Sequence, residues 1–123
     1  MGASVTDKEK DDELLNKWKI EQNIPPTTRK IKKIVQPLFS SNSMKKELIN
    51  SLESLFIQWV KNHYPSSKNT PECFRKIVNN CPNDIIFELH SSFLIWRQLK
   101  TPDAKQDVLE FIFRSLAKGI SGC

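Results

Sequence analysis

Apolar residues recur every three or four positions along almost the whole chain, and this spacing most constrains the fold. It places apolar side chains on one face of a helix, whereas a half-buried strand needs strict alternation. No alternating run bounded by hairpin turns is present. The interior also lacks glycine, since the three glycines are Gly2, Gly119 and Gly122. The pattern predicts an all-α fold and argues against a phosphate-binding loop or a dinucleotide-binding turn.

The periodicity, together with caps and prolines, predicts six helices. They cover residues 7–22, 28–36, 43–63, 71–80, 83–99 and 102–118. Thr6 and Glu9 have the spacing of a capping box, and Thr70 and Thr101 are each followed by a proline at the first helical position. Gly119 suits a C-terminal cap. Because the connections are short, we expect a compact bundle of five or six helices.

The apolar face of each predicted helix defines the expected core. Its members are Leu14, Leu15, Trp18, Ile20, Ile31, Ile34, Val35, Leu38, Leu48, Ile49, Leu52, Leu55, Phe56, Trp59, Val60, Phe74, Ile77, Val78, Ile85, Ile86, Leu89, Phe93, Leu94, Trp96, Val108, Leu109, Ile112, Phe113 and Leu116. The three tryptophans lie on these faces, so we interpret them as core residues rather than as base-stacking platforms.

Length, hydropathy and cysteine content limit the class of protein. The 123 residues fit one domain: a flexible N-terminus (1–6), a single helical domain (7–118) and a tail or cut end (119–123). No apolar run approaches the roughly 20 residues of a membrane span, and the charged N-terminus is unlike a secretory signal. The three cysteines are odd in number and lack C-x-x-C spacing, so we expect a reducing cytosolic compartment.

The net charge of +5 is unevenly distributed. Between Gln22 and Lys46 the chain has six basic residues and no acidic one. The basic residues are Arg29, Lys30, Lys32, Lys33, Lys45 and Lys46. Such a segment is either a solvated face or a surface that meets phosphate, in lipid headgroups or in nucleic acid.

Catalytic and metal-binding constellations are not evident in the sequence. His63 and His90 belong to no recognised motif, and Cys73 and Cys81 have no standard zinc-ligand spacing with them. We expect the two cysteines to pack as small apolar side chains. The carboxylates of the first helix lie where the helix dipole favours them. The sequence therefore predicts a protein that is not an enzyme and has no metal or cofactor.

The N-terminal stretch MGASVT fits the myristoylation pattern M-G-x-x-x-[ST], with Gly2 as the acceptor and Thr6 in the last position. The alternative is a chance match in a flexible N-terminus. One myristoyl chain binds membrane only marginally, so stable anchoring needs a second signal. The basic stretch Arg29–Lys46 can supply that signal at an anionic leaflet.

Three stretches, taken with Gly2 and the early basic surface, resemble a lentiviral-type retroviral matrix domain, the N-terminal part of a Gag polyprotein. ELLNKWKIEQN followed by RKIKKIV is similar to the family's first helix and basic segment. PECFRKIVNNC is similar to its short helix after a loop, and ELHSSFLIWRQLKTPDAKQDVLEFI to its late core helix and the start of the last one.

The resemblance implies a myristate on Gly2, with Arg29, Lys30, Lys32 and Lys33 in contact with anionic headgroups or RNA. It also implies self-association, often as trimers, and a place at the cytoplasmic face of the plasma membrane or another host membrane, and in virions. Two other functions stay open. One is a soluble helical module whose late apolar helices bind a partner protein, and the other is a helical nucleic-acid binder that uses the basic stretch.

Overall fold

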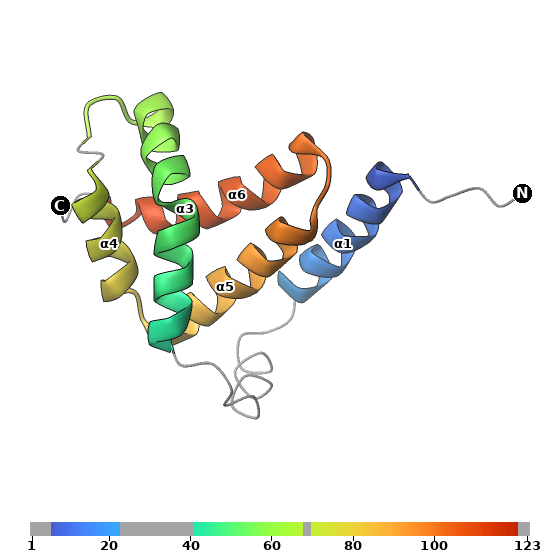
Figure 1. Cartoon of the computed structure of the whole chain (residues 1–123), viewed down its shortest axis with the longest axis horizontal. Helices are drawn as coiled ribbons and strands as arrows, with labels where there is room; N and C mark the ends of the chain where they lie inside the picture. The colour runs from blue at the N-terminus through green and yellow to red at the C-terminus, as the bar shows by residue number, and fades with distance from the viewer. Residues whose placement is uncertain (1–5, 23–40, 68–69, 121–123) are drawn as a thin grey trace, which may run out of the picture.

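The computed structural model describes residues 6–22, 41–67 and 70–120. Within these ranges the chain forms five helices and no strand, so the all-α prediction is confirmed (Figure 1). The helices are α1 (Asp7–Gln22), α3 (Ser41–His63), α4 (Pro71–Asn80), α5 (Asn83–Gln98) and α6 (Pro102–Ala117). The predicted helix over 28–36 lies outside the described residues. The other predicted helices are present: α1 and α4 have the predicted bounds, and α3, α5 and α6 each differ by one or two residues at one end.

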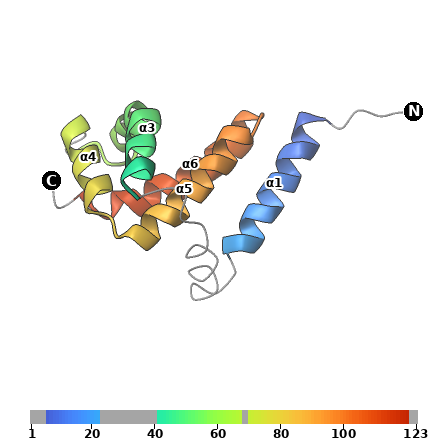
Figure 2. The same ribbon diagram turned by 60° about the horizontal axis from the view of Figure 1, so that its bottom comes forward.

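The helices α5 and α6 form the middle of the bundle. In both views α1 lies at one end of the molecule and α4 at the other, with α3 crossing α6 next to α4 (Figures 1 and 2). A cluster of aromatic side chains lies where α3, α4 and α6 meet. There Phe56 packs against Phe74 and Phe113, with ring centroids 4.8 and 5.2 Å apart. The late helices therefore hold the bundle together, and α1 packs onto their outer side.

Among the described residues, four that were expected in the core are exposed instead. The expected core residues Ile31, Ile34, Val35 and Leu38 lie outside the described part of the chain. Ile20 is 65% exposed, Leu55 and Leu94 are each 40% exposed, and Ile85 is 38% exposed. Each lies one or two positions from a buried residue, and each step along a helix rotates the side chain by about 100°. The apolar spacing therefore identified the buried face of each helix but included residues at its edges. The spacing cannot show how far a neighbouring helix covers that face.

The three predicted N-terminal caps lie at helix starts, and two of them make the side-chain hydrogen bond of a cap. The hydroxyl of Thr6 accepts a hydrogen bond from the amide of Glu9, and the hydroxyl of Thr70 accepts one from the amide of Cys73, both at 3.2 Å. Thr101 is the N-cap residue of α6 and Pro102 follows it as predicted, but the Thr101 side chain makes no capping hydrogen bond. Its hydroxyl donates instead to Asp11 on α1.

Gly119 has a different role from the expected left-handed cap. Its φ lies outside the left-handed region, and a Cβ placed there would lie 3.1 Å from Cγ1 of Ile77. Glycine allows the turn after α6 to approach α4 closely.

The buried Cys73 also differs from expectation, because it is disulfide-bonded, whereas Cys81 is a free thiol. Cys73 is also buried in the apolar core, as expected for a small apolar side chain.

Candidate functional site

Most of the predicted lipid- and phosphate-binding residues lie outside the described part of the chain. These are Gly2, Arg29, Lys30, Lys32 and Lys33. Lys45 and Lys46 are described, and they lie near the start of α3. Lys46 is exposed, whereas Lys45 is half-buried and its Nζ donates to the carbonyl oxygen of Asn79 at 3.0 Å. This carbonyl belongs to the last turn of α4, where the helix dipole favours a cation.

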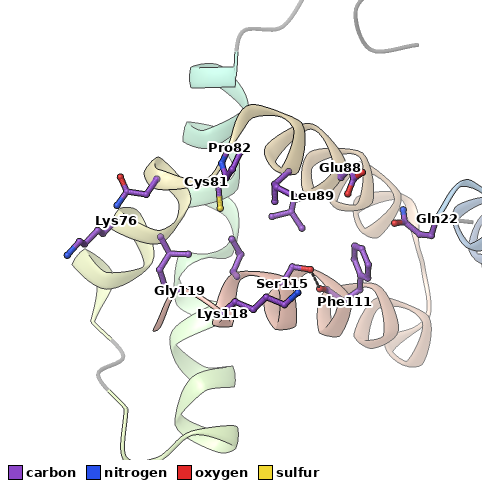
Figure 3. Close-up of a pocket in the computed structure, with 14 residues that line it drawn as sticks. Gln22, Lys76, Cys81, Pro82, Glu88, Leu89, Phe111, Ser115, Lys118 and Gly119 are labelled. Atoms are coloured by element: carbon purple, nitrogen blue, oxygen red, sulfur yellow. Dashed lines mark hydrogen bonds between the residues drawn. The ribbon is translucent and has the colours of Figure 1, made fainter. Parts of the chain in front are cut away.

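Next to this lysine, a groove of about 670 Å³ opens between the ends of four helices (Figure 3). Its apolar lining consists of Ile77, Cys81, Pro82, Ile85, Leu89, Phe111 and Leu116. Its polar lining consists of Gln22, Lys76, Asn80, Glu88, Ser115 and Lys118. Gly119 completes the lining, at the point where the last turn approaches α4. The volume lies within the roughly 300–1,000 Å³ that is typical of ligand pockets.

The free thiol of Cys81 is half-buried in this groove. Burial raises the pKa of the thiol from its ordinary value of 9.0, and the positive charge of Lys45 opposes that rise. The thiol therefore stays protonated at neutral pH and is a weak nucleophile. Its position suits a role in lining the groove rather than in covalent chemistry.

Outside the groove, a buried carboxylate on α1 forms hydrogen bonds with the turn between α5 and α6. Asp11 is 1% exposed, and it accepts hydrogen bonds from the amides of Lys100 and Thr101 at 2.9 and 2.6 Å and from the Thr101 hydroxyl at 2.7 Å. Burial by itself raises the pKa of Asp11. The hydrogen bonds from Thr101 and Lys100, with the charge of Lys105, outweigh this effect and lower the pKa.

The sequence analysis assigned this aspartate only to the N-terminal turns of the first helix, where the helix dipole favours a carboxylate, and missed its buried role. The available signal was its spacing: Asp11, Leu15 and Trp18 follow the i, i+4, i+7 pattern of one helix face, and all three are buried. A single carboxylate on an apolar stripe indicates a buried acceptor that needs donors.

A second polar cluster joins α3 to α6. Glu110 accepts from Nε1 of Trp59 at 3.2 Å and from Nε of Arg114 at 2.9 Å, and Nε2 of His63 lies 3.4 Å from it. The Trp59 hydrogen bond is the main cause of the lowered pKa of Glu110. Burial opposes it, and the charges of Arg114 and His63 support it. The cluster is structural, because each polar group pairs within the bundle.

The remaining histidine is buried, and its Nε2 has no hydrogen-bond partner among the described residues. His90 is 6% exposed, and its Nε2 lies 3.5 Å from a carboxylate oxygen of Glu47, which pairs in turn with Arg97 at 3.1 Å. Within the described ranges, no three His, Cys, Asp or Glu side chains come together as metal ligands. None of the described helices is long and apolar enough to cross a membrane.

Comparisons with protein-family models, with curated proteins and with solved structures find no match. Among the described residues, Lys45 at Asn79 and the apolar groove beside it are the features that lie together.

Proposed function

We propose that this protein is an N-myristoylated peripheral membrane protein of the matrix type. It binds the anionic inner leaflet of a host membrane through an acyl chain on Gly2 and a basic surface, and it supports assembly by self-association. The observation that carries the proposal is the M-G-x-x-x-[ST] start followed by a basic stretch without an acidic residue. These are the two signals that stable anchoring needs.

The distribution of charge in the fold is compatible with this proposal. The first turn of α1 carries the exposed acidic residues Asp7 and Glu9, and it lies far from the first turn of α3 in both views (Figures 1 and 2). Lys45 and Lys46 can therefore face a membrane while the acidic turn points away from it. The resemblance to the matrix family also extends the proposal to RNA as a competing ligand of the basic surface.

The test measures sedimentation of the myristoylated full chain with vesicles of neutral lipid, with or without phosphatidylserine. We expect Gly2→Ala to abolish binding. We expect Lys45→Gln with Lys46→Gln to weaken binding to anionic vesicles on the order of tenfold or more, at roughly 1 kcal/mol per lysine.

The matched control is Lys8→Gln with Lys10→Gln, which removes the same charge from the acidic end of α1. This control should bind nearly as the unmodified sequence does. Unchanged binding of Gly2→Ala would refute the acyl anchor. Equal losses in both lysine pairs would show that only net charge matters and that the basic surface has no specific role.

A second candidate function is a soluble helical module that binds a partner protein. The apolar groove between α4, α5 and α6 favours it, because large concave apolar surfaces of this kind mark binding sites.

A further inference from the structure

The groove continues the surface on which α1 packs. Trp18 of α1 lies edge-on against Phe111, with ring centroids 5.3 Å apart, and its Nε1 donates to Ser92 of α5 at 2.9 Å. Gln22, the last residue of α1, lines the groove, and so does Phe111 (Figure 3). The seam between α5 and α6 therefore already holds one helix, and the groove is the part of the seam beyond the end of that helix.

The lining of the groove fits an amphipathic helix better than a hydrocarbon chain. Ile85 and Phe111 offer apolar contacts for side chains spaced along one helix face, whereas Leu89 is only 2% exposed. Gln22 and Asn80 offer polar groups along the same groove, and the Ser115 hydroxyl already donates to the carbonyl oxygen of Phe111. A hydrocarbon chain would cover Gln22 and Asn80 without giving them hydrogen-bond partners, which is costly. A peptide carries its own polar groups and can satisfy them.

Charge determines which peptide the groove would accept. Lys76 extends from α4 at one end of the groove, whereas the side chain of Lys118 runs along α6 toward Ser115 (Figure 3). Lys45 lies close enough to Cys81 to influence its pKa. Glu88 lies nearer to Gln22, on the side of the groove away from Lys76 (Figure 3). An acidic segment complements these lysines, whereas the chain's own segment after Gln22 carries the same sign as they do.

We infer that this groove is the docking site for an acidic amphipathic helix of a partner protein, seated in line with α1. The apolar face of that helix covers Ile85 and Phe111, and its acidic residues lie near Lys76 and Lys118. This is a protein-binding site distinct from the membrane-binding function proposed above, and it does not depend on acylation.

The test uses two synthetic amphipathic helices of roughly four turns. Both carry leucines at i, i+3, i+4 and i+7, and they differ only in flanking residues, which are glutamates in one and lysines in the other. Fluorescence anisotropy with the full, unacylated chain measures their binding in the absence of lipid. We expect the acidic peptide to bind at least about tenfold more tightly than the basic one. We also expect it to protect Cys81 from a thiol reagent.

Two substitutions on α5 provide a matched pair. Ile85 and Leu94 are similarly exposed, at 38% and 40%, but only Ile85 lines the groove. Ile85→Asp should weaken binding of the acidic peptide by about tenfold or more, and Leu94→Asp should leave it unchanged. Lys118→Gln should weaken binding by a few-fold, with a smaller dependence on salt.

Three results would overturn the inference: equal binding of both peptides, equal effects of Ile85→Asp and Leu94→Asp, or an unprotected Cys81. Absence of peptide binding, with Ile85→Asp reducing binding to anionic vesicles instead, would also overturn it and would assign the groove to lipid. Because the peptide assay contains no membrane, failure of the acyl anchor in the vesicle test leaves this result unaffected.

Discussion

At the scale of single residues, the buried carboxylate of Asp11 accepts hydrogen bonds from residues just before α6, not from the first-turn amides that an N-cap side chain would bond. Helix α6 begins after Thr101, whose own side chain does not cap it. The carboxylate reaches across from α1 and accepts from the backbone amides at Lys100 and Thr101. One residue therefore provides the acceptor for two backbone amides in the turn before α6, and it attaches α1 to the bundle.

We predict that Asp11→Asn lowers the melting temperature by several degrees and speeds hydrogen exchange in α1. The amide side chain lacks the negative charge, and its NH₂ group would face donors at Thr101. Circular dichroism and hydrogen exchange measure the two effects. The adjacent Asp12→Asn is the control, since Asp12 is exposed. Equal effects at both positions would mean that the loss of charge, not the contact, is responsible.

At the scale of helices, α3 shows that burial can change completely between two adjacent residues. Phe56 is 2% exposed and packs among Trp59, Phe74 and Phe113, whereas its neighbour Leu55 is 40% exposed. Both residues are apolar and belong to the same spacing pattern. Contact with α4 and α6 distinguishes them, and the spacing contains no information about those helices.

We predict that Phe56→Ala reduces the free energy of unfolding by roughly 3–5 kcal/mol, because it removes a large buried side chain and leaves a cavity. Leu55→Ala should cost less than about 1 kcal/mol, as surface substitutions usually do. Chemical denaturation of both variants measures the difference. Comparable losses at the two positions would contradict the described packing of α3.

At the scale of the whole molecule, two carboxylates make the free energy of unfolding depend on pH. The pKa values of Asp11 and Glu110 are lowered in the folded protein, from ordinary values of 3.8 and 4.5. At pH values between the folded-state pKa and the ordinary pKa of each carboxyl group, the unfolded chain binds more protons than the folded one. Stability therefore rises with pH in this window, and it is lost as the pH falls through the folded-state pKa values.

We predict that the melting temperature falls as the pH is lowered from about 5 to about 3. The fall should be smaller in a double variant, Asp11→Asn with Glu110→Gln, because that protein has neither carboxylate to protonate. Thermal unfolding at each pH compares the two proteins. Parallel curves would assign the acid sensitivity to other carboxylates.

The sequence by itself determined the helices, since their spacing, caps and prolines are local properties. Thr70 caps α4 through a bond three residues away, and such a bond needs no other element. It also suggested the acyl and basic signals, which are patterns along the chain and stay proposals.

Only the tertiary structure decided the edges of the buried faces, the contact of Asp11 with Thr101, and the groove. These features join residues far apart in the chain, such as Gln22, Lys76 and Lys118. Their positions depend on how the helices are placed relative to one another. That placement is set by the packing of all the helix faces together, and no local pattern contains it.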